Sequence, residues 1–157
     1  KFECVDRRSN RPIRIKDIKV SGRAFELFDQ IIHNGLSNAR KRSVLRNDTE
    51  ILIRVTRDVS DLTIWIGNNF AKGQLGAMRK HQARAKKIVT RATRPRKSKG
   101  KRRVNSYKEG GYGFLKVIDA CERLLKVPPV FNFPIISAED GQFIVEIKLP
   151  GAEALLV

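Results

Sequence analysis

The chain has 157 residues, 41% hydrophobic and 7% aromatic, which is enough apolar material to bury the core of one domain. Its apolar runs are far shorter than the roughly 20 residues that cross a bilayer, and its first residues lack the apolar stretch of a secretory signal. Cys4 and Cys121 have neither metal-ligand spacing nor a disulfide framework. We therefore expect a cytoplasmic protein with reduced thiols and, because the chain starts at Lys1 instead of Met, a larger parent.

The formal net charge of +17 is concentrated in one segment. Between Ala71 and Lys108 lie 15 Lys and Arg residues and no Asp or Glu. The rest of the chain carries 18 basic and 16 acidic residues, a balance of only +2. The sequence therefore predicts a single, nearly neutral domain over residues 1–157 with a basic insertion at about 71–109.

Hydrophobic periodicity predicts the elements of the first half of the chain. Residues 2–5 and 13–20 have the character of short strands. Ser21 is a candidate N-cap, and a helix follows it whose apolar residues recur at helical spacing. These residues are Ala24, Phe25, Phe28, Ile31, Ile32, Leu36 and Ala39. After a turn at 46–48, alternation over 51–56 and 62–66, on either side of a turn at 58–61, predicts a β-hairpin.

The second half begins in the basic segment, where 77–89 favours a short helix and 94–109, which has no apolar period, favours a loop. The glycine cluster at 110–113 precedes a helix over 114–125, which Pro128 and Pro129 end. Strands over 130–136 and 142–149 flank a turn at 139–141. The order ββ-α-ββ-loop-α-ββ predicts a two-layer α/β sandwich, with a mostly antiparallel sheet and helices on one face.

The first helix carries the most specific polar pattern. Asn34 and Asn38 lie four residues apart and share a helix face, with Lys41 one turn further on. Magnesium takes only one or two protein oxygens and keeps its waters, and lysine offers a point charge to phosphate. Such a helix edge can hold Mg²⁺ and a triphosphate. The plainer alternative is a solvated helix face.

The order of helix, hairpin and glycine cluster resembles that of the GHKL (Bergerat-fold) ATPases. Residues 30–41 resemble the N-box of histidine kinases, which implies that Asn38 is the Mg²⁺ ligand and that Asn34 and Lys41 lie beside the phosphates. Residues 111–114 look like the glycine element that closes over the phosphates, which implies roles for Gly111 and Gly113. Residues 140–150 are similar to the last strand of the family, which ends in Leu-Pro. The resemblance implies ATP and Mg²⁺ as cofactors.

The adenine side departs from the family pattern. Where the family has Asp-Asn-Gly-x-Gly, this chain has residues 68–72, so that Asn68 replaces the aspartate and Phe70 and Lys72 replace the two glycines. The resemblance still implies that Asn68 and Asn69 lie at the base. Gly141 falls where the family offers a threonine to the base. We expect Phe70 to take up space intended for adenine.

Two histidines are assigned no catalytic role. His33 is expected at the edge of the core and His81 in solvent, and Trp65 is expected to pack on a sheet face.

Two hypotheses of function are open. In the first, the chain is the ATP-binding catalytic domain of a histidine-kinase-like (two-component) signalling protein, which transfers the γ-phosphate to a histidine on another domain or partner, with 71–109 as the ATP lid. In the second, its catalysis has decayed and the basic lid binds nucleic acid or another polyanion. A pseudo-kinase domain that only docks proteins is a third possibility.

Overall fold

The computed structural model describes residues 2–6, 11–12, 21–42, 50–93, 112–136 and 141–152. Their helices and strands, in chain order, are β1 (Phe2–Asp6), β2 (Arg11–Pro12), α1 (Gly22–Arg42), β3 (Ile51–Asp58), β4 (Asp61–Phe70), a 3-10 turn (Lys72–Gln74), α2 (Leu75–Thr93), α3 (Tyr112–Leu124), β5 (Val130–Asn132), β6 (Ile135–Ile136) and β7 (Gly141–Leu149).

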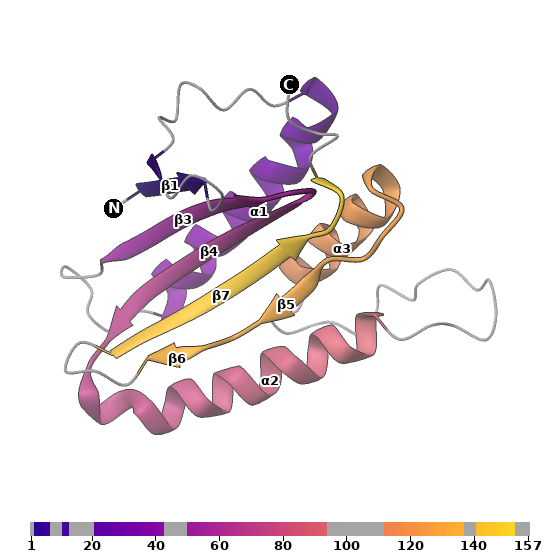
Figure 1. Ribbon diagram of the computed structural model, residues 1–157. Helices are drawn as coiled ribbons and strands as arrows, with labels where there is room; N and C mark the ends of the chain where they lie inside the picture. The colour runs from indigo at the N-terminus through magenta and orange to yellow at the C-terminus, as the bar shows by residue number, and fades with distance from the viewer. Residues whose placement is uncertain are drawn as a thin grey trace.

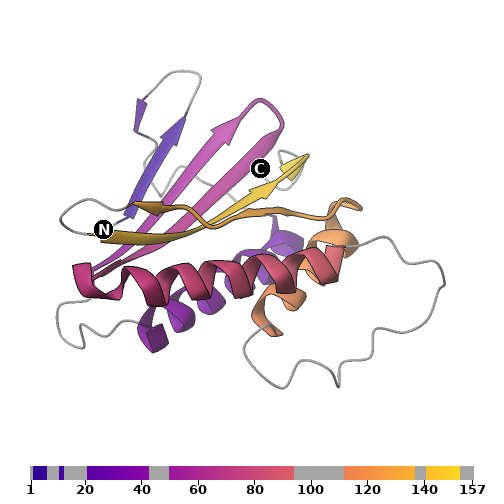
Figure 2. The ribbon, with the colours of Figure 1, turned by 90° about the horizontal axis from the view of Figure 1, so that it is seen from below.

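Within these residues seven strands form one sheet, in the order β2-β1-β3-β4-β7-β5, with β6 also paired to β7 (Figure 1). Of the described strand pairs, β1 and β3 run parallel and the others antiparallel. The longest ladder joins β4 to β7, from Leu62 opposite Leu149 to Phe70 opposite Gly141. α1, α2 and α3 all cover the same face of the sheet (Figure 2). The predicted two-layer sandwich is confirmed.

Two hydrophobic clusters lie between the sheet and the helices. The first, here called the aliphatic core, packs α1 and α3 against the centre of the sheet. Its buried members are Ala24, Leu27, Ile31, Leu62, Ile64, Ile66, Val117, Ala120, Cys121, Ile147, Leu149 and Ala152. On β4 these side chains alternate with residues of the opposite face, as a strand requires.

The second cluster, the aromatic core, packs α2 against the β5–β7 edge. Its buried members are Phe70, Met78, Ala85, Val89, Phe133 and Phe143, with Phe114 and Phe131 packed against them. The ring of Phe114 meets those of Phe131 and Phe133 edge to face, with centroids 5.4 and 5.5 Å apart. The Gln82 side chain donates a 2.6 Å hydrogen bond to the carbonyl of Phe133, which fixes α2 to this edge.

Several predicted boundaries change. α2 runs from Leu75 to Thr93, longer than the predicted helix over 77–89. β4 continues past residue 66 to Phe70 because its whole length pairs with β7. The predicted strand over 130–136 divides into β5 and β6, since Phe133 turns into the aromatic core and Pro134 has no N–H for a ladder. The carbonyl of Pro134 still accepts a hydrogen bond from Ile144.

The buried face of α1 also differs from the prediction. Leu27 is fully buried, although the apolar pattern omitted it, and Phe25 is 70% exposed although the pattern included it. The helix begins at Gly22, directly after the predicted cap Ser21. Predictions for 13–20, 46–48, 94–109 and 139–140 lie outside the described residues. Among the described helices, none is long and apolar enough to cross a membrane.

Candidate functional site

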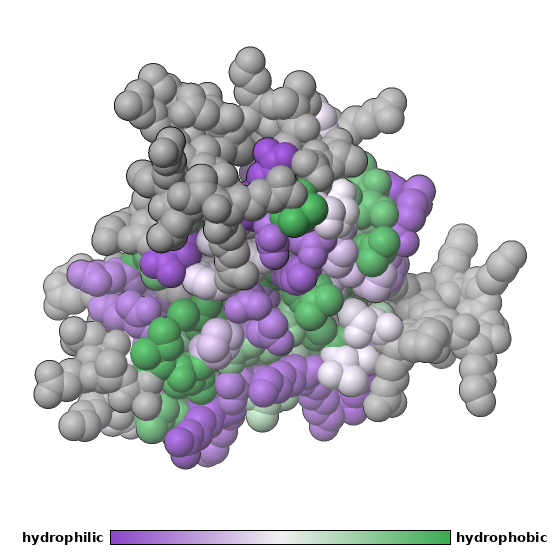
Figure 3. Space-filling view, viewed as in Figure 1, coloured by the Kyte–Doolittle hydropathy of each residue, from purple (hydrophilic) through white to green (hydrophobic). Residues whose placement is uncertain are grey.

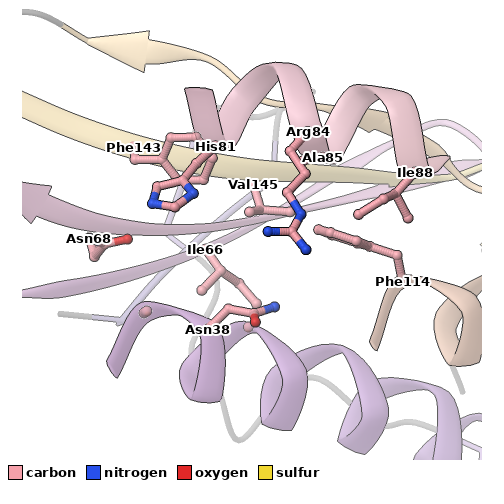
Figure 4. Close-up of a pocket in the computed structure, with 12 residues that line it drawn as sticks. Asn38, Ile66, Asn68, His81, Arg84, Ala85, Ile88, Phe114, Phe143 and Val145 are labelled. Carbon is pink, nitrogen blue, oxygen red and sulfur yellow. The ribbon is translucent and has the colours of Figure 1, made fainter. Parts of the chain in front are cut away.

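A pocket lies between the helices and the middle of the sheet, with α1 on one side and α2 on the other (Figure 4). It contains about 570 Å³ of space free of protein atoms, open solvent at its mouth included. The residues that line it are Gly35, Asn38, Ala39, Ile66, Asn68, His81, Arg84, Ala85, Ile88, Phe114, Phe143 and Val145. It therefore separates the aliphatic core from the aromatic core.

The lining is mostly apolar, with four polar side chains, Asn38, Asn68, His81 and Arg84. An apolar floor with a few placed polar groups is typical of sites for small organic ligands. No carboxylate is among the lining residues, and Arg84 adds a positive charge. Such a pocket suits a ligand with an apolar ring and a negative charge.

Asn68 lies on β4 and is 6% exposed. Its amide nitrogen donates a 3.0 Å hydrogen bond to the carbonyl of Asn69, and its amide oxygen faces into the pocket (Figure 4). Asn68 therefore presents an acceptor to a ligand, at the position where the family resemblance puts an aspartate.

Asn69, the next residue, does not line the pocket. Successive strand residues point to opposite faces of a sheet. Its side-chain oxygen accepts a 2.9 Å hydrogen bond from the backbone of Glu50, and its own N–H donates to the Glu50 carbonyl at 3.3 Å. Asn69 thus extends the pairing of β3 with β4 and lies apart from the site implied for it.

Asn38 lines the pocket from α1 and points across it toward Arg84 of α2 (Figure 4). Asn34, one turn earlier, does not line the pocket; its amide nitrogen donates a 2.7 Å hydrogen bond to the carbonyl of Gln30. Its side-chain oxygen faces Gly113, where a Cβ atom would lie only 2.9 Å away. The missing side chain of Gly113 is what lets α3 begin so close to α1.

Two more of the implied site residues can be placed only in part. Lys41 belongs to the last turn of α1, where the structure describes its backbone only. Gly111 lies outside the described residues. The beginning of α3 nevertheless reaches the pocket, because Phe114 in its first turn is a lining residue. The first N–H groups of a helix have no partners within it and favour an anion.

Sequence reasoning missed the contribution of α2. His81 was expected in solvent, yet it is half-buried and lines the pocket together with Arg84. The two residues are three apart and share a helix side with Ala85 and Ile88, a spacing that was present in the segment predicted as helical. The expectation that His33 lies at the edge of the core is also wrong, since this side chain is exposed to solvent.

Phe70 is not among the residues that line the pocket. It is 5% exposed, in the aromatic core, and its ring packs against Gly141. A Cβ atom at Gly141 would lie 2.5 Å from Cζ of this ring. The two departures from the family pattern are therefore one packing arrangement, in which the ring occupies the volume of the side chain that Gly141 lacks.

The donor set of the pocket fits magnesium only in its usual phosphate-bound form. No group of three or more His, Cys, Asp or Glu side chains that could hold a metal is found in the described part of the chain. Mg²⁺ is commonly bound through one or two protein oxygens together with waters and substrate phosphates. The side-chain oxygen of Asn38 would supply one such ligand, so the residues present fit the ion when a polyphosphate accompanies it.

No protein-family model matches the chain, and no curated protein matches it. Among solved structures, it is similar to two nucleotide-free crystal forms of the catalytic domain of histidine kinase ThkA. The first is 11% identical with a TM-score of 0.40, over 96% of this chain and 79% of that one. The second is 12% identical with a TM-score of 0.41, over 96% and 78%. At this identity and TM-score the likeness does not assign the chain to a family.

Proposed function

We propose that the pocket binds ATP with Mg²⁺ and that the chain is the ATP-binding catalytic domain of a histidine-kinase-like signalling protein. The observation that carries this proposal is the order of groups along one pocket (Figure 4). Asn68 lies at one end, Asn38 and Arg84 face each other midway, and Phe114 of the first turn of α3 lies at the other end. This order suits a base, then a ribose and phosphates.

At the base end, the inward-facing oxygen of Asn68 accepts a hydrogen bond from the exocyclic amino group of adenine. Ile66 and Val145 supply the apolar surface beneath the ring. A neutral amide accepts a weaker hydrogen bond than a carboxylate, roughly half as strong. We therefore expect weaker binding than an aspartate would give, with the same preference for an amino group.

Beyond the base, Arg84 midway along the pocket and the first N–H groups of α3 at its other end bind the phosphates. A guanidinium binds phosphate oxygens with two parallel hydrogen bonds, and a helix N-terminus adds partial positive charge. Asn38 would hold Mg²⁺, and the ion would neutralise charge on the triphosphate. Positioning and charge neutralisation are the main requirements of phosphoryl transfer.

The transfer step needs no base from this pocket. A neutral imidazole carries a lone pair on one ring nitrogen, which can attack the γ-phosphorus while the bond to the β–γ bridging oxygen breaks and ADP leaves. The acceptor histidine belongs to another domain or a partner protein. The contribution of this chain is to hold the triphosphate in line with that nitrogen.

Calorimetric titration with Mg-ATP tests the binding step. We expect Asn38→Ala to weaken binding at least tenfold, because it removes the metal ligand, whereas His33→Ala on the exposed side of the same helix leaves binding unchanged. We expect Asn68→Asp to tighten binding about tenfold, since a charged acceptor strengthens the hydrogen bond. Asn69→Asp makes the same chemical change on the opposite face of β4 and should have no such effect. The absence of saturable binding, or equal effects of both Asn→Asp changes, would refute the proposal.

A further inference from the structure

Helix α2 has a second face that the pocket does not use. Its inward face buries Met78, Ala85 and Val89. Its outward face carries five exposed cations, here called the basic ridge, which are Arg79, Lys80, Lys86, Lys87 and Arg91. α2 runs along the outside of the molecule, and the corresponding lower edge of the space-filling view is largely hydrophilic (Figures 2 and 3). The ridge residues do not line the pocket.

The ridge is arranged in two rows. At about 100° per residue, Arg79 and Lys86 form one row, and Lys80, Lys87 and Arg91 form the other. Between the rows runs a line of small exposed residues, seven apart, which are Gly76, Ala83 and Thr90. From Arg79 to Arg91 the ridge is about 18 Å long at 1.5 Å per residue. A flat strip flanked by cations can approach a polyanion closely.

The charges of α2 are unfavourable to the isolated helix. α2 contains no Asp or Glu, and Lys87 and Arg91 are like charges four residues apart, as are Lys80 and Arg84. Such pairs repel on a helix surface. Within the described part of the chain, no ion pair engages the five ridge side chains. An external polyanion would remove the repulsion.

We propose that the basic ridge binds the phosphate backbone of double-stranded nucleic acid without reading its sequence. A duplex carries one negative charge per roughly 1.7 Å of its axis, so the ridge of about 18 Å faces more phosphates than its five cations can neutralise. An α-helix about 10–12 Å wide also fits a DNA major groove about 12 Å wide, with the two rows beside the two strands.

Two further features of α2 favour a duplex and exclude sequence reading. α2 has no Phe, Tyr or Trp, and its one imidazole, His81, faces the pocket, so the ridge offers no platform on which the bases of a single strand could stack. The small residues between the rows lack the Arg, Asn or Gln side chains that read base edges. The bound group is therefore the phosphate backbone itself.

Fluorescence anisotropy with a 20-base-pair duplex, titrated at several salt concentrations, tests the proposal on the full chain. The ridge variant carries Lys80→Gln, Lys86→Gln and Lys87→Gln. The matched control removes three cations from the exposed side of α3 and the turn after it, with Lys116→Gln, Arg123→Gln and Lys126→Gln. Each phosphate contact contributes about 0.9 to the slope of log K against log salt. We expect the ridge variant to lose about 2 to 3 from this slope and up to about 100-fold in affinity near 0.15 M salt, and the control to lose far less.

The outcomes separate this proposal from the nucleotide site. Binding of duplex DNA that depends on the ridge, with Mg-ATP affinity unchanged in the ridge variant, supports it. Equal losses in the ridge variant and the control would show that net charge alone attracts the duplex, which overturns it. Equally tight binding of a single strand, or tighter binding of vesicles containing anionic lipid, would also overturn it.

Discussion

The two walls of the pocket are built differently. The α1–α3 wall rests on the aliphatic core, and it carries Asn38 and the close contact of Asn34 with Gly113. The α2 wall rests on the aromatic core and carries His81 and Arg84. Asn38 and Gly113, from two of the segments that resemble the GHKL pattern, belong to the first wall, whereas Phe70 and Gly141, two of the departures from it, belong to the second.

This difference shows that the departures are linked. A ring at position 70 and a hydrogen at position 141 fill one volume, since the two residues are register partners on β4 and β7. The pocket beside them remains open, and Asn68 still presents an oxygen to it. The α2 wall therefore departs from the pattern at Phe70 and Gly141, while the side-chain oxygen of Asn68 still faces the pocket. The α1–α3 wall depends instead on the close approach of the α3 backbone at Gly113 to the side chain of Asn34. A larger residue at position 113 would collide with that side chain.

The thiol of Cys121 reports on the packing of the α1–α3 wall. This side chain is fully buried in the aliphatic core, and burial raises its pKa to about 12, with a smaller contribution from Glu122. The thiolate is the reactive form, so we expect alkylation at pH 8 to be about three orders of magnitude slower than for a free thiol. Mass spectrometry of a Cys4→Ser variant, in which Cys121 is the single thiol, measures the rate. The same variant unfolded in urea is the control, and similar rates in the two states would show that this wall opens readily.

Placing a threonine at position 141, as the resemblance would imply, tests the linkage in the α2 wall. A side chain at position 141 meets the buried ring of Phe70, with a 2.5 Å approach of Cβ to Cζ, so we expect Gly141→Thr to destabilise the protein by about 2–3 kcal/mol. Urea unfolding measures this change.

The control is the same substitution in a Phe70→Ala background. Phe70→Ala alone should cost about 3–5 kcal/mol because it leaves a cavity. Threonine at 141 partly fills that cavity, so its own cost should fall by at least about 1 kcal/mol. Strictly additive losses would show that the two positions are independent.

Much of the fold could be predicted because its periodicities are regular. β3 and β4 form the predicted hairpin, and α1 begins directly after Ser21. The buried side of α1 could not be predicted exactly. Phe25 and Leu27 lie on nearly opposite sides of the helix, and the position of the sheet decides that Leu27 is the buried one. The extension of β4 to Phe70 depends on its pairing with β7, a contact between residues about 70 apart in sequence.

The motif order singled out pocket residues on α1 and β4 but none on α2. It singled out Asn38, Asn68 and Asn69. Asn38 and Asn68 line the pocket, whereas strand alternation turns Asn69 to the other face of the sheet. His81 and Arg84 were missed because the basic segment was interpreted by its charge. Its helical period separates a pocket-facing side from an outward side, and that separation gives the same helix two different surfaces.

The smallest predicted effect compares one substitution at two glycines, Gly35 on α1 and Gly76 on α2. In a helix, alanine is favoured over glycine by roughly 0.5–1 kcal/mol. At Gly76 a Cβ atom would meet nothing within 4 Å, so we expect Gly76→Ala to stabilise the protein by up to that amount. At Gly35 the Cβ atom would collide with the side chain of Ile66, and overpacking of this kind costs about 1–3 kcal/mol.

We therefore expect Gly35→Ala to lower the free energy of unfolding by about 1 kcal/mol, the opposite sign to Gly76→Ala. Thermal or urea unfolding of the two variants measures the difference. Because Gly35 and Ile66 both line the pocket, Gly35→Ala should also weaken Mg-ATP binding, whereas Gly76→Ala should not. If both substitutions stabilised the protein and left binding unchanged, Ile66 would have moved aside without cost, and close approach of α1 to the sheet would not be what positions Asn38.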